Sequence, residues 1–307
     1  MLKRKDLLGL RDVSAEEIYE ILETGKKMRE HLDKGDKNLG LLDGKSAITL
    51  FYENSTRTRV SFELAAKYLG ATEVNIAAAT SSVQKGETLI DTGKTLDALK
   101  TDFIIIRHPM AGAPHLLAKT VKASVISGGD GINEHPTQAL LDMLTLYRKF
   151  GKIEGLKVAI LGDIKHSRVA KSNVFGLTKL GAKVSVYAPK TLIPAEFEKL
   201  GATVANSREE AIDGADAVMG LRIQLERQSG GNFPSLSEYS SLYGVKPSHM
   251  KYAKPNAIVM HPGPVNRGVE LTPELIDGQS SYIEDQVTNG LSVRMAILSL
   301  LAQAREN

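Results

Sequence analysis

Residues 48–60 read ITLFYENSTRTRV, and the segment SFELAAKYLG follows at residues 61–70. The apolar run predicts a buried strand, and the second segment has the composition of a helix. Hydroxyl side chains and two arginines lie between them. A helix N-terminus supplies N–H donors and partial positive charge, and arginine donates paired hydrogen bonds to phosphate. The stretch therefore predicts a phosphate site where the strand passes into the helix. The alternative is a surface loop with two solvated arginines.

The rest of the chain alternates between strand-like and helix-like segments. Strands are predicted at residues 45–52, 73–77, 102–106, 124–127, 157–163 (with the loop that follows), 183–187, 217–221 and 255–260. Helices are predicted at residues 15–32 (after an N-cap at Ser14), 61–69, 139–150 and 289–304. Such alternation is typical of an α/β fold with parallel sheets. A length of 307 residues suits two domains.

Polar side chains follow three of the predicted strands. Arg57 and Arg107 each come shortly after a strand, and His135 follows the turn-rich segment GGDG at residues 128–131. Ligands of parallel sheets bind beyond the carboxyl ends of the strands, so these three side chains should converge on one pocket. His108 lies one residue further from its strand end and is interpreted as a packing histidine.

Composition excludes several classes of protein. The net charge is only +3, without a basic tract, so nucleic acid is not expected as a partner. The chain has no cysteine, which excludes disulfides and thiol chemistry and fits a reducing compartment. No run approaches about 18 apolar residues, so we expect a cytoplasmic protein without a membrane partner. The G-x-x-x-x-G-K-[ST] and G-x-G-x-x-G patterns are absent, which disfavours nucleotide sites, although Gly162-Asp163 follows a strand.

Taken together, these motifs resemble those of the transcarbamoylase family over nearly the whole chain. The matching residues are Ser55-Thr56-Arg57-Thr58-Arg59, Arg107-His108-Pro109, His135-Pro136-Thr137-Gln138, Gly162-Asp163, Arg168, Arg222-Ile223-Gln224 and His261-Pro262-Gly263-Pro264. The resemblance implies two doubly wound parallel-sheet domains linked by two crossing helices. Residues 1–150, joined by the C-terminal helix 289–307, would bind carbamoyl phosphate, and residues 151–288 would bind aspartate.

The resemblance also implies a role for each motif residue. Carbamoyl phosphate would be bound by Ser55, Thr56, Arg57, Thr58, Arg107, His135, Gln138, Pro262, Gly263 and Pro264. Aspartate would be bound by Ser81, Lys85, Arg168, Arg222 and Gln224. The catalytic residues would be Arg57, Thr58, Lys85, Arg107 and His135, of which Thr58, Arg107 and His135 would polarise the carbonyl group. The Gly263–Pro264 peptide bond would be cis.

The implied activity is transfer of a carbamoyl group from carbamoyl phosphate to the amino group of L-aspartate, an early step of pyrimidine biosynthesis. No cofactor or metal is expected, and the histidines show no H-x-x-x-H spacing. An ornithine enzyme would typically carry a cysteine in the motif that begins here at His261, and this chain has none. Transfer to ornithine or another amino acid, and a non-catalytic phosphoanion-binding subunit, are the alternatives. Arg168 and Arg222 would otherwise be ordinary surface charges.

Residues 77–88 are small, lack periodicity and contain one lysine, as in a plain linker. In aspartate-specific members of the family, the corresponding loop reaches into the active site of the neighbouring subunit, and Ser81 and Lys85 match it. The resemblance therefore implies a homotrimer with shared active sites. It leaves open whether trimers associate with regulatory chains or with a dihydroorotase. Residues 228–254 are predicted to be a second long, loop-rich segment.

Overall fold

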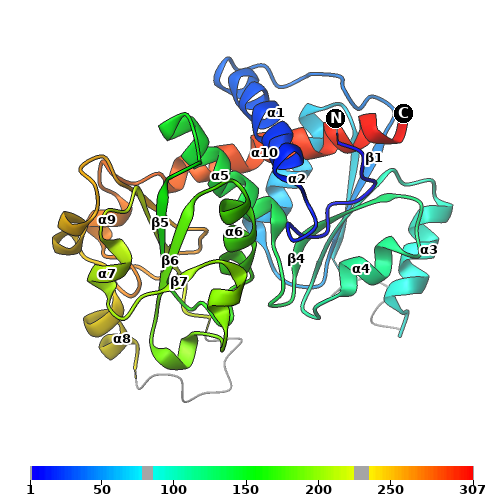
Figure 1. Cartoon of the computed structure of the whole chain (residues 1–307). Coiled ribbons are helices and arrows are strands. Elements are labelled where there is room, and N and C mark those ends of the chain that lie inside the picture. Colours follow the sequence, from blue (N-terminus) through cyan, green and yellow to red (C-terminus); the bar gives the residue numbers. More distant parts are fainter. Residues whose placement is uncertain (1, 78–85, 225–234, 307) are drawn as a thin grey trace. The chain divides into compact units, whose positions relative to one another are not determined.

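The computed structural model describes residues 2–77, 86–224 and 235–306 (Figure 1). The chain divides into two compact units, Met1–Leu144 with Val287–Asn307, and Thr145–Gln286. Each unit contains one sheet of parallel strands, which confirms the predicted α/β fold class. Among the described helices, none combines the length and the apolar composition needed to cross a membrane.

The sheet of the first unit has the strand order β2-β1-β3-β4. Its strands are β1 (Ser46–Phe51), β2 (Thr72–Ala77), β3 (Phe103–His108) and β4 (Ser124–Asp130). The chain runs outward from β1 to β2 and, in the opposite direction, from β3 to β4, so the sheet is doubly wound. The central strands β1 and β3 are nearly continuous apolar runs, as strands covered on both faces require.

Helices surround this sheet. They are α1 (Ala15–Asp33), α2 (Thr56–Tyr68), α3 (Leu89–Ala98) and α4 (Ala113–Ala118), together with α5 (Pro136–Phe150) and α10 (Ile283–Glu306), which both run through the boundary between the units. Leu96 of α3 and Leu117 of α4 pack with Ile48, Leu50 and Ile106 of the strands in one buried cluster. The predicted N-cap at Ser14 is confirmed, since its hydroxyl accepts the Glu17 N–H.

Several predicted boundaries in the first unit were wrong, including the end of β3, which continues through Arg107 to His108. Helix α2 begins at Thr56 instead of residue 61, because Ser55 already has the extended backbone of an N-cap residue. Helix α5 begins at Pro136 instead of residue 139, and proline is favoured at the first helical position because it lacks an N–H. Strand β4 continues to Asp130, so most of the GGDG segment is strand. The corrected start of α2 places Arg57 in the opening turn of a helix.

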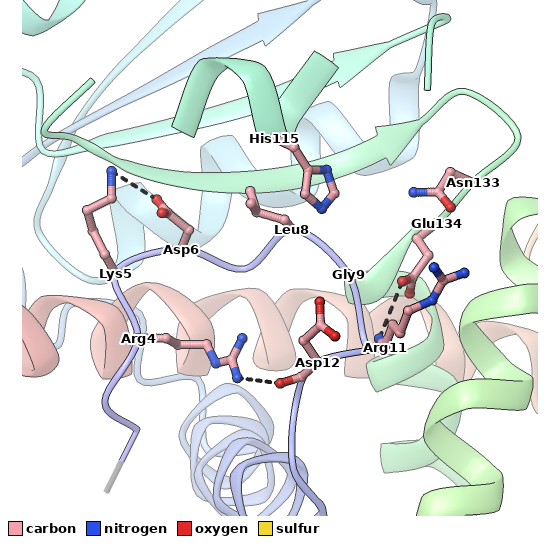
Figure 2. A pocket seen from close by; sticks show the side chains of 10 residues that line it. All are labelled: Arg4, Lys5, Asp6, Leu8, Gly9, Arg11, Asp12, His115, Asn133 and Glu134. Atoms are coloured by element: carbon pink, nitrogen blue, oxygen red, sulfur yellow. Dashed lines mark hydrogen bonds and ion pairs between the residues drawn. The ribbon is translucent and has the colours of Figure 1, made fainter. Parts of the chain in front are cut away.

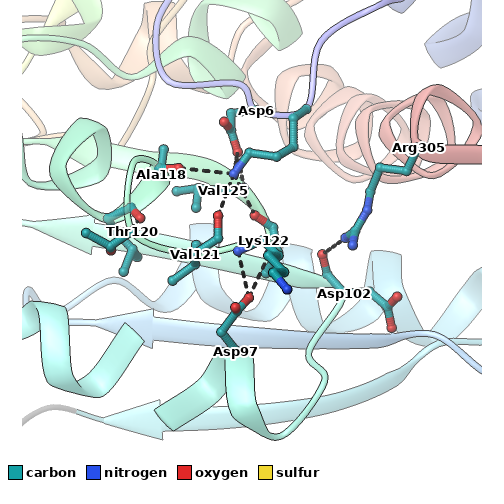
Figure 3. A network of polar contacts seen from close by, with 12 residues as sticks. Asp6, Asp97, Asp102, Ala118, Thr120, Val121, Lys122, Val125 and Arg305 are labelled. Atoms are coloured by element: carbon teal, nitrogen blue, oxygen red, sulfur yellow. Dashed lines mark hydrogen bonds and ion pairs between the residues drawn. The ribbon is translucent and has the colours of Figure 1, made fainter. Parts of the chain in front are cut away.

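The N-terminal segment is fastened to the edge of this sheet by a polar network (Figure 3). Lys5 donates to the carbonyl oxygens of Ala118, Val121 and Ala123. Asp6 accepts the Val125 N–H at 2.8 Å, and burial raises the pKa of this carboxyl. Residues 5–7 therefore belong to the packed unit, because their polar groups are satisfied by the backbone around β4.

The sheet of the second unit has the order β7-β6-β5-β8-β9 and is also doubly wound. Its strands are β5 (Lys157–Gly162), β6 (Lys183–Tyr187), β7 (Thr203–Val204), β8 (Ala217–Leu221) and β9 (Ile258–Met260). Its helices are α6 (Arg168–Lys179), α7 (Arg208–Ile212), α8 (Leu236–Tyr243) and α9 (Pro273–Ile276), with short 3-10 turns η3 (Lys190–Leu192), η4 (Phe197–Leu200) and η6 (Pro247–Tyr252). Alternate strand residues Ala159, Leu161, Val218 and Val259 share one buried cluster.

The prediction that residues 228–254 are mainly loop was wrong for the part that the structure describes. Helix α8 and the turn η6 occupy most of residues 235–254. The Ser235 hydroxyl caps α8 by accepting the Glu238 N–H, and the side chain of Tyr239, within this helix, is buried. The short strand β7 was also missed, since two residues carry no periodic signal.

Candidate active site

Each sheet has one point where its strand order reverses, between β1 and β3 in the first unit and between β5 and β8 in the second. Crevices beyond such a point are the usual ligand sites of open parallel sheets. The strand registers place Phe51, at the end of β1, beside Arg107 of β3. In the second unit they place Gly162, at the end of β5, beside Leu221 of β8. The Ser-Thr-Arg-Thr-Arg motif and the Arg-Ile-Gln motif begin just beyond these positions.

The first turn of α2 has the features of an anion site. Ser55 is its N-cap residue, but the Ser55 hydroxyl makes no capping hydrogen bond. The turn contains no acidic residue, so nothing within it neutralises the positive end of the helix dipole. Arg57 is exposed in this turn, whereas Thr58 is buried. Hydroxyl, backbone N–H and guanidinium donors are thus concentrated at one helix end.

The second arginine of the motif is directed elsewhere. Arg59 donates to Glu63, one turn further along α2, at 3.0 Å. Asn75 of β2 donates to the same carboxylate oxygen, also at 3.0 Å. These contacts draw Arg59 toward β2, away from the β1–β3 switch point. Of the two motif arginines, Arg57 is therefore the better candidate for a ligand at that point.

Arg107 of β3 joins the segment that follows β1 to strand β4. Its Nε lies 3.2 Å from a carboxylate oxygen of Glu53, which follows β1, and its Nη1 donates to the carbonyl oxygen of Gly128 in β4 at 3.4 Å. The Arg107 and Glu53 side chains retain 15% and 19% exposure. The guanidinium group thus has one carboxylate beside it and still reaches solvent at the strand ends.

A β-bulge lies directly beside Arg107. The pairing of β3 with β4 shifts between Ile106 and His108, so that Gly128 and Gly129 together face one residue of β3. Gly129 has a φ of 136°, which side chains with a Cβ rarely adopt. A bulge increases the local twist and redirects neighbouring side chains. It gives a structural reason for the paired glycines in the sequence.

His135 and Gln138 lie at the start of α5. His135 directly precedes the helix, is 4% exposed, and accepts the Gln138 and Ala139 N–H groups through its carbonyl oxygen. Gln138 lies in the first turn, and its Nε2 donates to Asp142 at 2.9 Å. By contrast, His108 packs its ring against Tyr52 with 4.6 Å between ring centroids, and burial lowers its pKa. These contacts agree with the interpretation of His108 as a packing residue.

In the second unit, Asp163 organises the switch point. This fully buried carboxylate follows β5 and accepts the backbone N–H groups of His166 and Gln224, each at 3.2 Å. The Nδ1 atom of His166 lies 2.9 Å from the same carboxylate. Asp163 therefore ties the start of α6 to the segment that follows β8.

One arginine follows each of the two strands at this switch point. Arg168 is the first residue of α6 and only 3% exposed, and the N-cap residue Ser167 accepts the Ala170 N–H at 3.1 Å. Arg222 directly follows β8 and is half-buried. Since β5 and β8 are neighbours, both arginines lie at the same edge of the sheet. This edge can receive an acidic ligand.

The segment after β9 is held by a buried histidine and glutamate. The Gly263 N–H donates to His261 Nδ1 at 2.8 Å, so the ring proton is on Nε2, which donates to Glu270 at 3.1 Å. The same Glu270 oxygen accepts the Asn266 N–H at 2.8 Å. The Gly263–Pro264 peptide bond is cis, as predicted. Residues 261–266 are thereby held in one conformation at the end of β9.

Two predicted site residues, Ser81 and Lys85, lie outside the described residues, so their role stays a prediction. The first unit also contains a cavity of about 330 Å³ beneath the N-terminal segment (Figure 2). Arg4 and Glu134 line it, and both already have partners, Glu17 for the arginine and backbone N–H groups for the carboxylate. None of the predicted site residues lines this cavity.

Fold and site together define a parallel α/β protein of two units with cationic groups at the switch point of each sheet. The family model for the carbamoyl-P binding domain of aspartate/ornithine carbamoyltransferases matches residues 5–148, and the model for their Asp/Orn binding domain matches residues 154–301. The chain belongs to the aspartate/ornithine carbamoyltransferase family.

Individual relatives give the same result. The chain is 64% identical to the aspartate carbamoyltransferase catalytic subunit of Ruminiclostridium cellulolyticum, over 98% of this chain and 96% of the relative. Among solved structures, it is similar to aspartate transcarbamoylase from Trypanosoma cruzi in complex with carbamoyl phosphate and aspartate, with a TM-score of 0.86, 32% identity and 97% of each chain covered. It is equally similar in fold to ornithine carbamoyltransferase from Pyrococcus furiosus, with a TM-score of 0.86, 34% identity and 96% of each chain covered.

Sequence reasoning missed several residues around these sites. Asp142 lies four residues after Gln138 in the same helix, a spacing that the sequence shows and that could have suggested the contact. Glu53 and Glu270 gave no such signal, because each meets its partner only after strands have paired or a loop has folded back. Asp163 was noticed only as part of a Gly-Asp pair.

Proposed function

We propose that this chain transfers the carbamoyl group of carbamoyl phosphate to the amino group of L-aspartate, giving N-carbamoyl-L-aspartate and phosphate, an early step of pyrimidine biosynthesis. The observation that carries the proposal is the first turn of α2, which lacks acids and a hydroxyl cap and places Arg57 at the same switch point as Arg107. Two relatives, 64% and 61% identical to this chain, are named aspartate carbamoyltransferase catalytic subunits.

In this proposal the first unit holds carbamoyl phosphate. Ser55, Thr56, Arg57, Thr58 and Arg107 bind the phosphate through hydroxyl, backbone and guanidinium donors. Thr58, Arg107 and His135 donate to the carbonyl oxygen, where negative charge develops as the amine attacks. Each well-placed donor of this kind contributes about 3 to 4 kcal/mol to transition-state stability.

The reaction needs no covalent intermediate. The amino nitrogen of aspartate forms a bond to the carbonyl carbon, and the bond from that carbon to the phosphate oxygen breaks. The proton that the amine loses passes to the departing phosphate. Gln138 and the backbone carbonyl groups around Pro262, Gly263 and Pro264 accept from the carbamoyl NH₂ group and so hold the carbonyl carbon in line.

The second unit supplies the specificity for aspartate. Arg168 and Arg222 bind the two carboxylates, and Gln224, whose backbone N–H donates to Asp163, lies two residues after Arg222. Two guanidinium groups at the carboxyl ends of neighbouring strands suit a dicarboxylate. The side-chain ammonium group of ornithine would instead need an acidic residue there. The Asp163 carboxylate is already occupied by backbone N–H groups and His166.

The proposal includes a homotrimer in which Ser81 and Lys85 of one subunit complete the site of the next. Four arginines and a shared lysine would then face a phosphate and two carboxylates, about four negative charges in all. A cytoplasmic location belongs to the same proposal and fits a chain without cysteine.

One assay tests the proposed activity. Transfer from carbamoyl phosphate is measured with L-aspartate and, separately, with L-ornithine as acceptor. We expect carbamoyl-aspartate and no carbamoyl-ornithine. Product from ornithine alone would favour the other branch of the family, and binding of phosphate without transfer to either acceptor would indicate a non-catalytic subunit.

A further inference from the structure

The amide of Gln138 is held by a buried carboxylate on its own helix. Its Nε2 lies 2.9 Å from Oδ1 of Asp142, one turn further along α5. Gln138 is 8% exposed, and Asp142 is fully buried. We propose that Asp142 is a positioning residue that determines which end of the Gln138 amide faces the substrate, and that it thereby selects a carbonyl donor with an NH₂ group. The inference rests on the proposed function and deepens it.

The hydrogen-bond chemistry of the two groups determines the orientation. An ionised carboxylate can only accept, whereas an amide donates at its nitrogen and accepts at its oxygen. The Nε2 end of Gln138 must therefore face Asp142, and the Oε1 end must face away from it. Oε1 is then the atom that can accept from a carbamoyl NH₂. The flipped amide would place Oε1 against the Asp142 carboxylate and Nε2 against the carbamoyl NH₂, so two acceptors would meet at one end and two donors at the other.

Arg294 of α10 is a buried cation whose charge interacts with that of Asp142. Arg294 is 4% exposed, and burial lowers its pKa to about 10, an effect that the charge of Asp142 opposes, so the guanidinium group stays cationic at neutral pH. Its Nη1 donates to the Ser61 hydroxyl at 3.0 Å, and its guanidinium carbon lies 5.2 Å from the centre of the Phe62 ring. A buried charge persists when an opposite charge and hydrogen bonds compensate it.

Residues of this cluster belong to three helices, α2, α5 and α10. Ser61 and Phe62 belong to α2, whose first turn carries Arg57. Asp142 belongs to α5, whose first turn carries Gln138. Asp142 contacts the amide of Gln138 within α5, and Arg294 of α10 contacts Ser61 and Phe62 of α2.

The choice of donor reports the orientation of the amide. Acetyl phosphate carries a methyl group where carbamoyl phosphate carries NH₂, so it cannot donate to Oε1. The readout is the ratio of kcat/KM with carbamoyl phosphate to kcat/KM with acetyl phosphate. Loss of one well-formed hydrogen bond in a buried site lowers this ratio by about 10- to 100-fold. General damage to the structure lowers both values and leaves their ratio unchanged. The ratio is therefore a readout that a purely structural role of Asp142 would not move.

The experiment measures transfer to L-aspartate from both donors by four forms of the full chain. These are the wild type, Gln138→Met, the pair Asp142→Leu with Arg294→Met, and all three substitutions combined. Removing both buried charges together avoids leaving one uncompensated. We expect the ratio to fall about 10-fold in Gln138→Met and in the paired variant, and the triple variant to be no lower than Gln138→Met. An unchanged ratio in the paired variant would overturn the inference. So would a ratio in the triple variant that is clearly lower than in Gln138→Met.

A second variant tests the inference if the paired variant does not fold. Asp142→Asn keeps the shape but offers either an oxygen or an NH₂ group to Gln138, so both amide orientations become available. We expect a ratio about two- to fivefold lower than wild type, and no effect of Asp142→Asn in the Gln138→Met background. A wild-type ratio would contradict the inference.

Asn133→Leu is the matched control, since Asn133 makes the same amide-to-carboxylate bond to Asp130, at 2.8 Å, in the same unit. It should lower stability and leave the ratio unchanged; a ratio that falls as far as in Gln138→Met would overturn the inference. A wild-type chain that transfers from neither donor would refute the proposed function itself, an outcome distinct from a ratio that fails to respond to Asp142.

Discussion

Replacing Arg57 with alanine should abolish turnover and leave the fold intact. Arg57 is exposed in the first turn of α2 and belongs to neither described core cluster. Surface substitutions of this kind usually change the free energy of unfolding by less than about 0.5 kcal/mol. Thermal or urea unfolding of the variant should therefore match the wild type, and any loss of activity can be assigned to the site.

The size of the effect follows from the hydrogen bonds that are lost. A hydrogen bond to a charged group contributes about 1.5 to 3 kcal/mol, and one guanidinium group can donate two to a phosphate. Losing both weakens phosphate binding by at least about 3 kcal/mol, or roughly 100-fold in Kd. Arg59 cannot readily replace Arg57, because it donates to Glu63 at 3.0 Å on the side of β2.

The measurements are calorimetric titration with inorganic phosphate and initial rates with carbamoyl phosphate. Arg59→Ala is the matched control, being the same substitution two residues further along the same helix. We expect Arg59→Ala to keep phosphate affinity and rate within about threefold of wild type. Near-normal activity of Arg57→Ala, or an equal loss in Arg59→Ala, would refute the assignment of phosphate binding to Arg57.

Three further outcomes are expected. Mixed trimers of Lys85→Ala and Arg57→Ala chains should regain part of the activity, because some interfaces then join an intact Arg57 to an intact Lys85; stably mixed trimers without recovery would exclude the shared site. Glu270→Ala should lower the free energy of unfolding by about 2 to 4 kcal/mol in urea titrations, because it leaves one buried and one partly buried donor without an acceptor; a loss below about 0.5 kcal/mol would contradict this. Burial raises the folded-state pKa of Asp6, so its charge destabilises the fold above that pKa and has no such effect below the unfolded value near 3.8. Asp6→Asn should therefore be more stable than wild type at pH 7, with an advantage that disappears as the pH falls toward 3.5; lower stability of the variant at pH 7 would contradict the argument.

Local patterns were enough to predict many elements of this protein. Apolar runs predicted the strands of both sheets except β7, and Ser14 predicted the start of α1. Several errors occurred at element ends, where the conformation of one or two residues decides where a helix or strand begins or ends. Helix α2 starts at Thr56 because the backbone of Ser55 is already extended, a choice that residue composition leaves open.

By itself, the sequence determined which chemical groups are available: a strand that leads into hydroxyl and arginine donors, an arginine at the end of another strand, and two further arginines in the second half. These follow from local order, because strand ends and helix starts depend on neighbouring residues. Only the tertiary structure decided which groups meet. The reversal of strand order brings Arg107 level with the end of β1, and the return of α10 to the first unit brings Arg294 to the cluster that holds Asp142. Contacts between residues far apart in the chain depend on sheet pairing and core packing, which a periodic pattern does not encode.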